Sequence, residues 1–141
     1  MIHRTVVGDR KEYIKKQLSV LIQLAKIDLN YDQPEKKFIY DFGRKYNISR
    51  SEIEEIERNP VYIDRTNTFS NEERIRILYS VVRLAKVDRK ILPNEIVYCQ
   101  DIATKLGFKR SIIDALLPMV NDQPLEFVNY KAIWRKIAAF L

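Results

Sequence analysis

The sequence predicts an all-α fold of about seven helices, formed by two three-helix units and a closing C-terminal helix. The first reason is an internal repeat, because Leu-Ala-Lys-Ile-Asp at 24–28 returns sixty residues later as Leu-Ala-Lys-Val-Asp at 84–88. The second reason is that apolar residues recur at helical spacing in both copies, whereas no segment alternates as a strand does. A repeat of this length is typical of related structural units.

The first helix of each unit is predicted at about 9–27 and about 71–87. Four apolar residues of each helix lie on one face, and the two sets are repeat partners: Leu18, Leu21, Ile22 and Ala25, then Leu78, Val81, Val82 and Ala85. Ser70 and Glu73 have the spacing of a capping box, in which each residue accepts a backbone N–H of the other. The helix at about 71–87 is therefore expected to begin directly after Ser70.

The second helix of each unit follows a turn with proline and a carboxylate, Pro34-Glu35 and then Pro93 and Glu95. Proline early in a helix and a carboxylate in its first turn both favour a helix N-terminus. These helices are predicted to end at the repeat partners Asn47 and Gly107, since Asn and Gly best tolerate the left-handed conformation that closes a helix.

Short third helices are predicted at about 50–58 and 110–119, the first with a capping box of Ser49 and Glu52. The segment 59–69 contains Asn-Pro and Thr-Asn-Thr, so it is expected to be a loop. A last helix, about 125–140, has one apolar face that is expected to cover the seam between the units: Tyr130, Ile133, Trp134, Ile137, Ala138 and Leu141.

Length and composition favour one domain, residues 1–141, with the repeat at about 12–58 and 72–118. No apolar run approaches the roughly 18 residues of a membrane span, and the N-terminus lacks a secretory signal. The single cysteine, Cys99, has no partner for an internal disulfide. The expected compartment is the cytoplasm. The net charge of +6 makes acidic partners worth considering.

The two copies share a pattern of Ala, Asp and Glu at fixed spacing, and the second ends in a Leu-Gly helix terminus. This pattern resembles the TerB-like family of tellurite-resistance proteins, whose relatives include the N-terminal domain of the membrane-anchored DjlA co-chaperones. The resemblance covers roughly residues 12–120 and depends on these positions: Ala25, Asp28, Tyr31 and Glu35, then Ala85, Asp88, Ile91, Glu95, Leu106 and Gly107.

The resemblance implies an all-α domain of about seven helices with a pseudo-two-fold axis between its two units. It also implies a sensing or docking module without enzymatic activity, linked to metal-related or envelope stress. It directs attention to four acidic positions: Asp28, Glu35, Asp88 and Glu95. The chain departs from the family pattern where the family has Gly after the aspartate, because Leu29 and Arg89 occupy these positions.

Acidic residues at the turns are the candidates for binding a divalent cation, since hard cations take several oxygen ligands. The alternative is structural, because a carboxylate also stabilises a helix N-terminus. The first turn offers more oxygen ligands, while Arg89 and Lys90 compete for the carboxylates of the second. The candidate ligands are Asp28, Asp32, Glu35, Asp88 and Glu95.

Basic residues near two helix ends of the second unit could form a patch for nucleic acid. The alternative is that these cations stabilise helix C-termini, and this alternative is favoured because the chain has no recognition helix or RNA-binding motif. The candidates are Arg83, Lys86, Arg89, Lys90, Lys105, Lys109 and Arg110.

Apolar residues in the inter-unit loop and at the C-terminus are candidates for docking another protein: Tyr62, Ile63, Phe69, Phe140 and Leu141. They could instead fold back onto the core. An enzyme is not expected, because the only histidine is His3, Cys99 aligns with the core position Ile39, and no Gly-rich phosphate loop is present. The sequence therefore favours a non-enzymatic docking or sensing module, with cation binding and nucleic-acid binding as alternatives.

Overall fold

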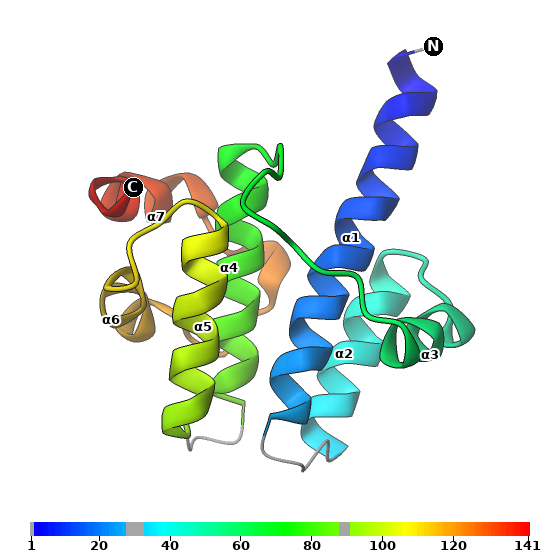
Figure 1. Cartoon of the computed structure of the whole chain (residues 1–141), viewed down its shortest axis with the longest axis horizontal. Helices are drawn as coiled ribbons and strands as arrows, with labels where there is room; N and C mark the ends of the chain where they lie inside the picture. The colour runs from blue at the N-terminus through cyan, green and yellow to red at the C-terminus, as the bar shows by residue number, and fades with distance from the viewer. Residues whose placement is uncertain (1, 28–32, 88–90) are drawn as a thin grey trace. The chain divides into compact units, whose positions relative to one another are not determined.

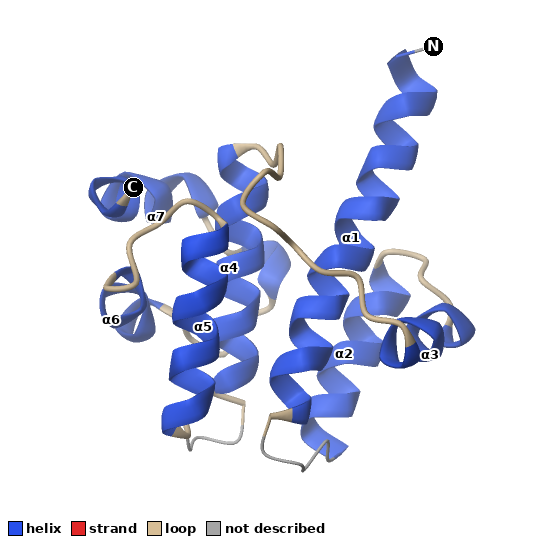
Figure 2. Ribbon diagram, viewed as in Figure 1, coloured by secondary structure: helices blue, strands red, loops and turns tan. Residues whose placement is uncertain are grey.

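The computed structural model describes residues 2–27, 33–87 and 91–141, and in these ranges it contains seven α-helices and no strand (Figures 1 and 2). The all-α prediction is confirmed. The chain divides into two compact units, Met1–Tyr62 and Ile63–Leu141. No helix in the described ranges is long and apolar enough to cross a membrane. The pseudo-two-fold axis stays a prediction.

Unit 1 consists of α1 (Ile2–Lys26), α2 (Gln33–Lys45) and α3 (Arg50–Arg58). Helix α1 packs against both α2 and α3, which also pack against each other. The apolar stripe predicted on α1 is buried, as are Ile39 and Phe42 of α2 and Ile53 and Ile56 of α3. The start predicted near residue 9 is wrong, because α1 begins at Ile2; the added turns contain no proline, and a single glycine within a helix costs only about 1 kcal/mol.

Unit 2 contains α4 (Asn71–Ala85), α5 (Pro93–Lys105), α6 (Ile112–Leu116) and α7 (Tyr130–Ile137). Short 3-10 turns follow at Leu117–Met119, Leu125–Phe127 and Ala138–Phe140. Helix α4 lies at the centre and packs against α5, α6 and α7. The closing helix α7 also packs against α6. The buried side chains of α4 include its whole predicted stripe, so the 3.6-residue period correctly identifies the core face.

Two predicted helices of unit 2 are interrupted in the structure. The helix predicted at 125–140 is broken because Asn129 is an N-cap, whose side chain accepts the Ala132 N–H at 3.1 Å. The helix predicted at 110–119 begins only at Ile112 and tightens into a 3-10 turn at Leu117, just before Pro118. Proline has no N–H to continue the α-helical hydrogen bonds.

The predicted ends of the second helices are confirmed. Asn47 and Gly107 both have a positive φ, 61° and 90°. In each unit the next N–H returns to the last turn of the helix: Ile48 N to Gly43 O and Phe108 N to Ala103 O, both at 2.9 Å. This is the hydrogen bond that closes a helix through a left-handed residue. One backbone requirement therefore explains why Asn and Gly occupy repeat-related positions.

The predicted caps of α3 and α4 are also confirmed. The Ser49 side chain accepts the Glu52 N–H at 3.1 Å and the Glu52 carboxylate accepts the Ser49 N–H at 3.0 Å. Ser70 and Glu73 form the same reciprocal pair at the start of α4. The hydrogen bond from Ser49, helped by Lys11, lowers the pKa of Glu52 to about 2, so this carboxylate is ionised at neutral pH.

A lysine closes the third helical segment of each unit. Lys26 Nζ donates to the Glu57 carbonyl at 2.8 Å, and its repeat partner Lys86 donates to the Leu117 carbonyl at 2.8 Å. Lys86 also donates to the Val120 carbonyl at 2.6 Å. The accepting residues Glu57 and Leu117 are themselves repeat partners. A lysine here satisfies carbonyls at a helix C-terminus and complements the negative end of its dipole.

Tyr79 on α4 is fully buried, yet its hydroxyl has no hydrogen-bond partner among the described residues. Its ring meets Tyr130 edge to face, with centroids 5.7 Å apart. Because an unpaired buried hydroxyl costs about 1–3 kcal/mol, we expect Tyr79→Phe to raise the free energy of unfolding by about 1 kcal/mol. Urea unfolding followed by Trp134 fluorescence would measure this change in unit 2.

Tyr130→Phe is the matched control, because the Tyr130 hydroxyl donates to the Leu125 carbonyl at 3.3 Å. That substitution should lower the free energy of unfolding by about 0.5–1.5 kcal/mol. A destabilised Tyr79→Phe protein would show that the Tyr79 hydroxyl is hydrogen-bonded in solution, contrary to the structure.

Candidate functional site

Three of the candidate cation ligands, Asp28, Asp32 and Asp88, lie outside the described residues. The other two, Glu35 and Glu95, lie in the first turns of α2 and α5 and are each 4% exposed. The Glu95 carboxylate accepts the Leu92 N–H at 2.9 Å, which is a capping role at the N-terminus of α5. In the described ranges, no three potential metal-ligating side chains of His, Cys, Asp or Glu lie together. The cation site stays a prediction.

Cys99 lies in the core of unit 2, as its alignment with Ile39 predicts, and is 2% exposed. Burial, reinforced by the charge of Glu95, raises the pKa of its thiol to about 12. The nucleophile in cysteine chemistry is the thiolate. A thiol that stays protonated at neutral pH and is buried acts as a small apolar core residue.

The basic candidate residues of unit 2 are of two kinds: side chains that hydrogen-bond to carbonyls of their own unit, and side chains on the surface. Arg89 and Lys90 lie outside the described residues. Lys105 is half-buried, whereas Lys109 and Arg110 are exposed, and Arg110 Nη1 lies 2.6 Å from Asp101 Oδ1.

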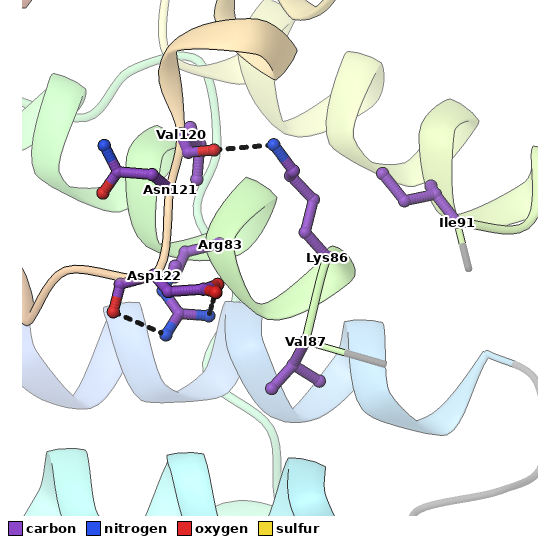
Figure 3. Close-up of a pocket in the computed structure, with 7 residues that line it drawn as sticks. All are labelled: Arg83, Lys86, Val87, Ile91, Val120, Asn121 and Asp122. Carbon is purple, nitrogen blue, oxygen red and sulfur yellow. Dashed lines mark hydrogen bonds and ion pairs between the residues drawn. The ribbon is translucent and has the colours of Figure 1, made fainter. Parts of the chain in front are cut away.

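Arg83 and Lys86 line an open cavity of about 650 Å³ beside the segment 120–122 (Figure 3). The ammonium of Lys86 points at the Val120 carbonyl, and Arg83 Nη2 donates to the Asp122 carbonyl at 3.4 Å. Arg83 and Lys86 thus both donate to the segment after α6, which lines the cavity, and hold it in place.

The five docking candidates differ in exposure. Tyr62 is 67% exposed and Leu141 is also exposed, whereas Phe69 and Phe140 are half-buried. Ile63 is buried, so the prediction that it is available to a partner is wrong and its alternative role in the core applies. The sequence reasoning missed Phe127, which is 71% exposed at the end of the 3-10 turn Leu125–Phe127. Single exposed apolar residues are ordinary on protein surfaces, so a site requires a shaped surface as well.

One shaped surface lies between the N-terminal half of α4 and α7, and we name it the α4–α7 groove. Its volume is about 290 Å³. The floor is apolar, because Ile75 and Tyr130 are buried, and Trp134 forms a half-exposed wall. The groove is lined by Asn71, Glu72, Ile75, Tyr130, Lys131, Trp134 and Arg135.

Two arginines of α4 hold the aromatic rings of this groove. The Arg74 guanidinium lies 5.5 Å from the centroid of Phe108 and 5.6 Å from that of Trp134, and its Nη1 donates to the Leu106 carbonyl at 3.1 Å. Arg76 lies 4.4 Å from the Tyr130 centroid. Such cation–π contacts are worth about 0.5–2 kcal/mol each. They fix the rings in the absence of a ligand.

A second shaped surface lies in unit 1, where α2 meets the start of α3, and we name it the basic hollow. Its volume is about 510 Å³. Its lining combines four cations with a tyrosine and two isoleucines: Lys36, Lys37, Tyr40, Arg44, Ile48, Ser49, Arg50 and Ile53.

Sequence reasoning missed the basic hollow, although part of the pattern is visible in the sequence. Lys36, Tyr40 and Arg44 recur at four-residue spacing, and Lys37 comes three residues before Tyr40, so all four lie on one face of α2. Arg50 comes from α3, and its guanidinium lies 5.7 Å from the Tyr40 centroid. Partial burial, together with the negative charges of Glu57 and Glu54, raises the pKa of the Tyr40 phenol, so Tyr40 is neutral at physiological pH.

Besides the cavity beside the segment 120–122, the described residues form the α4–α7 groove and the basic hollow. The TerB-like resemblance stays a prediction. No protein-family model, no curated protein and no solved structure matches this chain.

Proposed function

We propose that this chain is a non-enzymatic docking module of the TerB-like kind, which binds a protein partner through the α4–α7 groove. The observation that supports this proposal is the combination of aromatic walls, an apolar floor and a cationic rim in one small concavity. Trp, Tyr and Arg are the residues most enriched at binding hot spots. Here Trp134, Tyr130 and Arg135 occupy adjacent positions of that kind around the groove.

The rim favours a partner segment with acidic character. Lys131 and Arg135 are both exposed and lie one helical turn apart on α7. The groove also contains Glu72, but its carboxylate lies 3.3 Å from Arg76 Nε and is thereby paired. An apolar side chain in the groove would be covered by Trp134, while a neighbouring carboxylate reaches the rim. The expected partner segment therefore has an apolar anchor beside Asp or Glu.

The rigidity of the groove supports docking. Binding loses affinity when side chains must be ordered at the interface, at a cost of about 0.5–1.5 kcal/mol for each flexible side chain. Arg74 and Arg76 already hold Trp134 and Tyr130 in place. The partner would thus meet a preformed surface.

The test is to select a phage-displayed peptide library against the immobilised chain and to titrate enriched peptides by fluorescence. Trp134 is the only tryptophan, so its emission reports on the groove directly. We expect enriched peptides to share an apolar anchor beside acidic residues and to change Trp134 emission. Lys131→Glu/Arg135→Glu should weaken binding about tenfold or more, because both charges meet the ligand's carboxylates.

Lys136→Glu is the control, since Lys136 is exposed on the same helix but does not line the groove. It should bind within about twofold of the parent chain, the size expected of a charge outside the contact. Peptides that bind the double variant as tightly as the parent, or leave Trp134 emission unchanged, would exclude the groove as the docking site.

A further inference from the structure

The basic hollow of unit 1 has four cations in its lining, and the fold does not require the three that lie on α2. In unit 2 the repeat partners of Lys36, Lys37, Tyr40 and Arg44 are Ile96, Val97, Gln100 and Thr104. Helix α5 forms with the same length as α2, 13 residues, although none of these four positions carries a charge. The repeat therefore acts as an internal comparison, in which the same helix exists with and without the cations.

The ion pairs within the hollow leave room for a ligand. Asp41 pairs with both Lys37 at 2.8 Å and Arg44 at 3.3 Å, and Glu54 lies 3.7 Å from Arg50. One carboxylate is thus shared between two cations on α2. Exposed pairs of this kind contribute at most about 1 kcal/mol. The carboxylates of a ligand can consequently compete for Lys37 and Arg44.

The floor of the hollow is apolar, so a ligand that fits it must also have an apolar group. Ile48 and Ile53 line the hollow and are otherwise buried. The half-buried Tyr40 ring also lines the hollow, with the Arg50 guanidinium over its face. A ligand that matched this surface would carry negative charge and an apolar or aromatic group close together.

We propose that the basic hollow binds an acidic segment of a protein partner. Carboxylates of the segment meet Lys37 and Arg44, and a neighbouring apolar side chain packs against Tyr40 and Ile48. This inference rests on the proposed function in taking the partner to be a protein, but it assigns a second surface on the other unit.

A nucleic acid fits the hollow less well than an acidic peptide. Nucleic-acid surfaces gather cations along a continuous stripe that follows the phosphate chain. Here Asp41 and Glu54 lie among the cations and would repel a regular row of phosphates. Separate carboxylates can avoid these positions, whereas a polyphosphate backbone cannot.

The test titrates the isotope-labelled full chain with a synthetic peptide of alternating glutamate and phenylalanine, observed by amide NMR and anisotropy. The decisive variant exchanges residues for their repeat partners: Lys37→Val, Tyr40→Gln and Arg44→Thr. We expect the peptide to shift the amides of α2 and the start of α3. The exchange variant should bind about tenfold more weakly, because it removes two cations and the aromatic wall.

The matched control is Arg10→Gln/Arg58→Gln, which removes the same charge from exposed positions of unit 1 outside the hollow. It should retain the parent affinity, and circular dichroism should show the same helix content in all three proteins. If the control lost as much affinity as the exchange variant, the effect would come from net charge alone and the proposal would be wrong.

A single-stranded oligonucleotide of equal charge separates the two kinds of partner. If it binds the hollow more tightly than the peptide, with a steep dependence on salt, the hollow is a nucleic-acid site and the proposal is wrong. Peptides that change Trp134 emission but leave the α2 amides unshifted would overturn this inference and support docking at the α4–α7 groove. Peptides that shift the α2 amides but leave Trp134 emission unchanged would exclude the groove as a docking site and support the basic hollow.

Discussion

Lys86→Met is expected to lower the free energy of unfolding of unit 2 by about 2–3 kcal/mol, because hydrogen bonds from a charged donor contribute about 1.5–3 kcal/mol. The ammonium of Lys86 donates to two carbonyls, those of Leu117 and Val120. Methionine keeps the length and the apolar contacts of the lysine stem but satisfies neither carbonyl. Urea unfolding monitored by Trp134 fluorescence, which reports on unit 2, would measure the loss.

The repeat supplies the comparison for this substitution. Lys26 donates to one carbonyl, that of Glu57, so Lys26→Met should cost less, about 1–2 kcal/mol. Lys109 is an exposed lysine of unit 2, and Lys109→Met should change stability by less than about 0.5 kcal/mol. If Lys86→Met were as mild as Lys109→Met, water would satisfy both carbonyls and the ammonium would be free for a ligand.

This result bears directly on the nucleic-acid hypothesis. Lys86 belongs to the basic residues that the sequence suggested as a patch, yet in the structure its donors face its own unit. A variant of Lys86 that lost nucleic-acid binding would thus be ambiguous, since it would also loosen the segment after α6. Lys109 and Arg110, which are exposed, are the better residues for testing that hypothesis.

Local rules explain most of what the sequence predicted correctly. The cap at Ser49 and the left-handed ends at Asn47 and Gly107 each depend on a few neighbouring residues. The apolar stripes depend only on the helical period. A stretch of sequence about one helix long is enough to predict these features, and the second copy of the repeat gives the same prediction independently.

The surfaces could not be predicted in the same way, because they join residues that are distant in the sequence. The α4–α7 groove combines Ile75 with Trp134, and nothing in the sequence states that α7 packs on α4. The basic hollow likewise requires Arg50 of α3 to lie over Tyr40 of α2. The interruption at Asn129 was missed for a local reason, since one capping residue stands just before a convincing apolar stripe.

Gly43→Ala is expected to lower the free energy of unfolding of unit 1 by about 1–2 kcal/mol, although alanine is the better helix former. A Cβ at Gly43 would lie only 2.6 Å from Ile53 Cδ1 and 3.4 Å from Ile53 Cγ1. Ile53 is buried, so its side chain must shift to admit the new methyl group. The repeat partner of Gly43 is Ala103, so unit 2 tolerates at this position the residue that unit 1 should reject.

Ile53→Val removes the Cδ1 atom that the new methyl group would meet, so it should rescue Gly43→Ala. Alone, Ile53→Val should cost about 0.5–1.5 kcal/mol. The double variant should be more stable than the sum of the single effects by about 1 kcal/mol, a coupling measurable by urea unfolding and circular dichroism. Additive effects would show that Ile53 changes its conformation without cost.

Ile53 also lines the basic hollow. Gly43→Ala should therefore lower the affinity for the acidic peptide, because it displaces the Ile53 side chain. The double variant should restore this affinity. Affinity and stability that recover together would establish that the close packing of α2 on α3 builds the hollow.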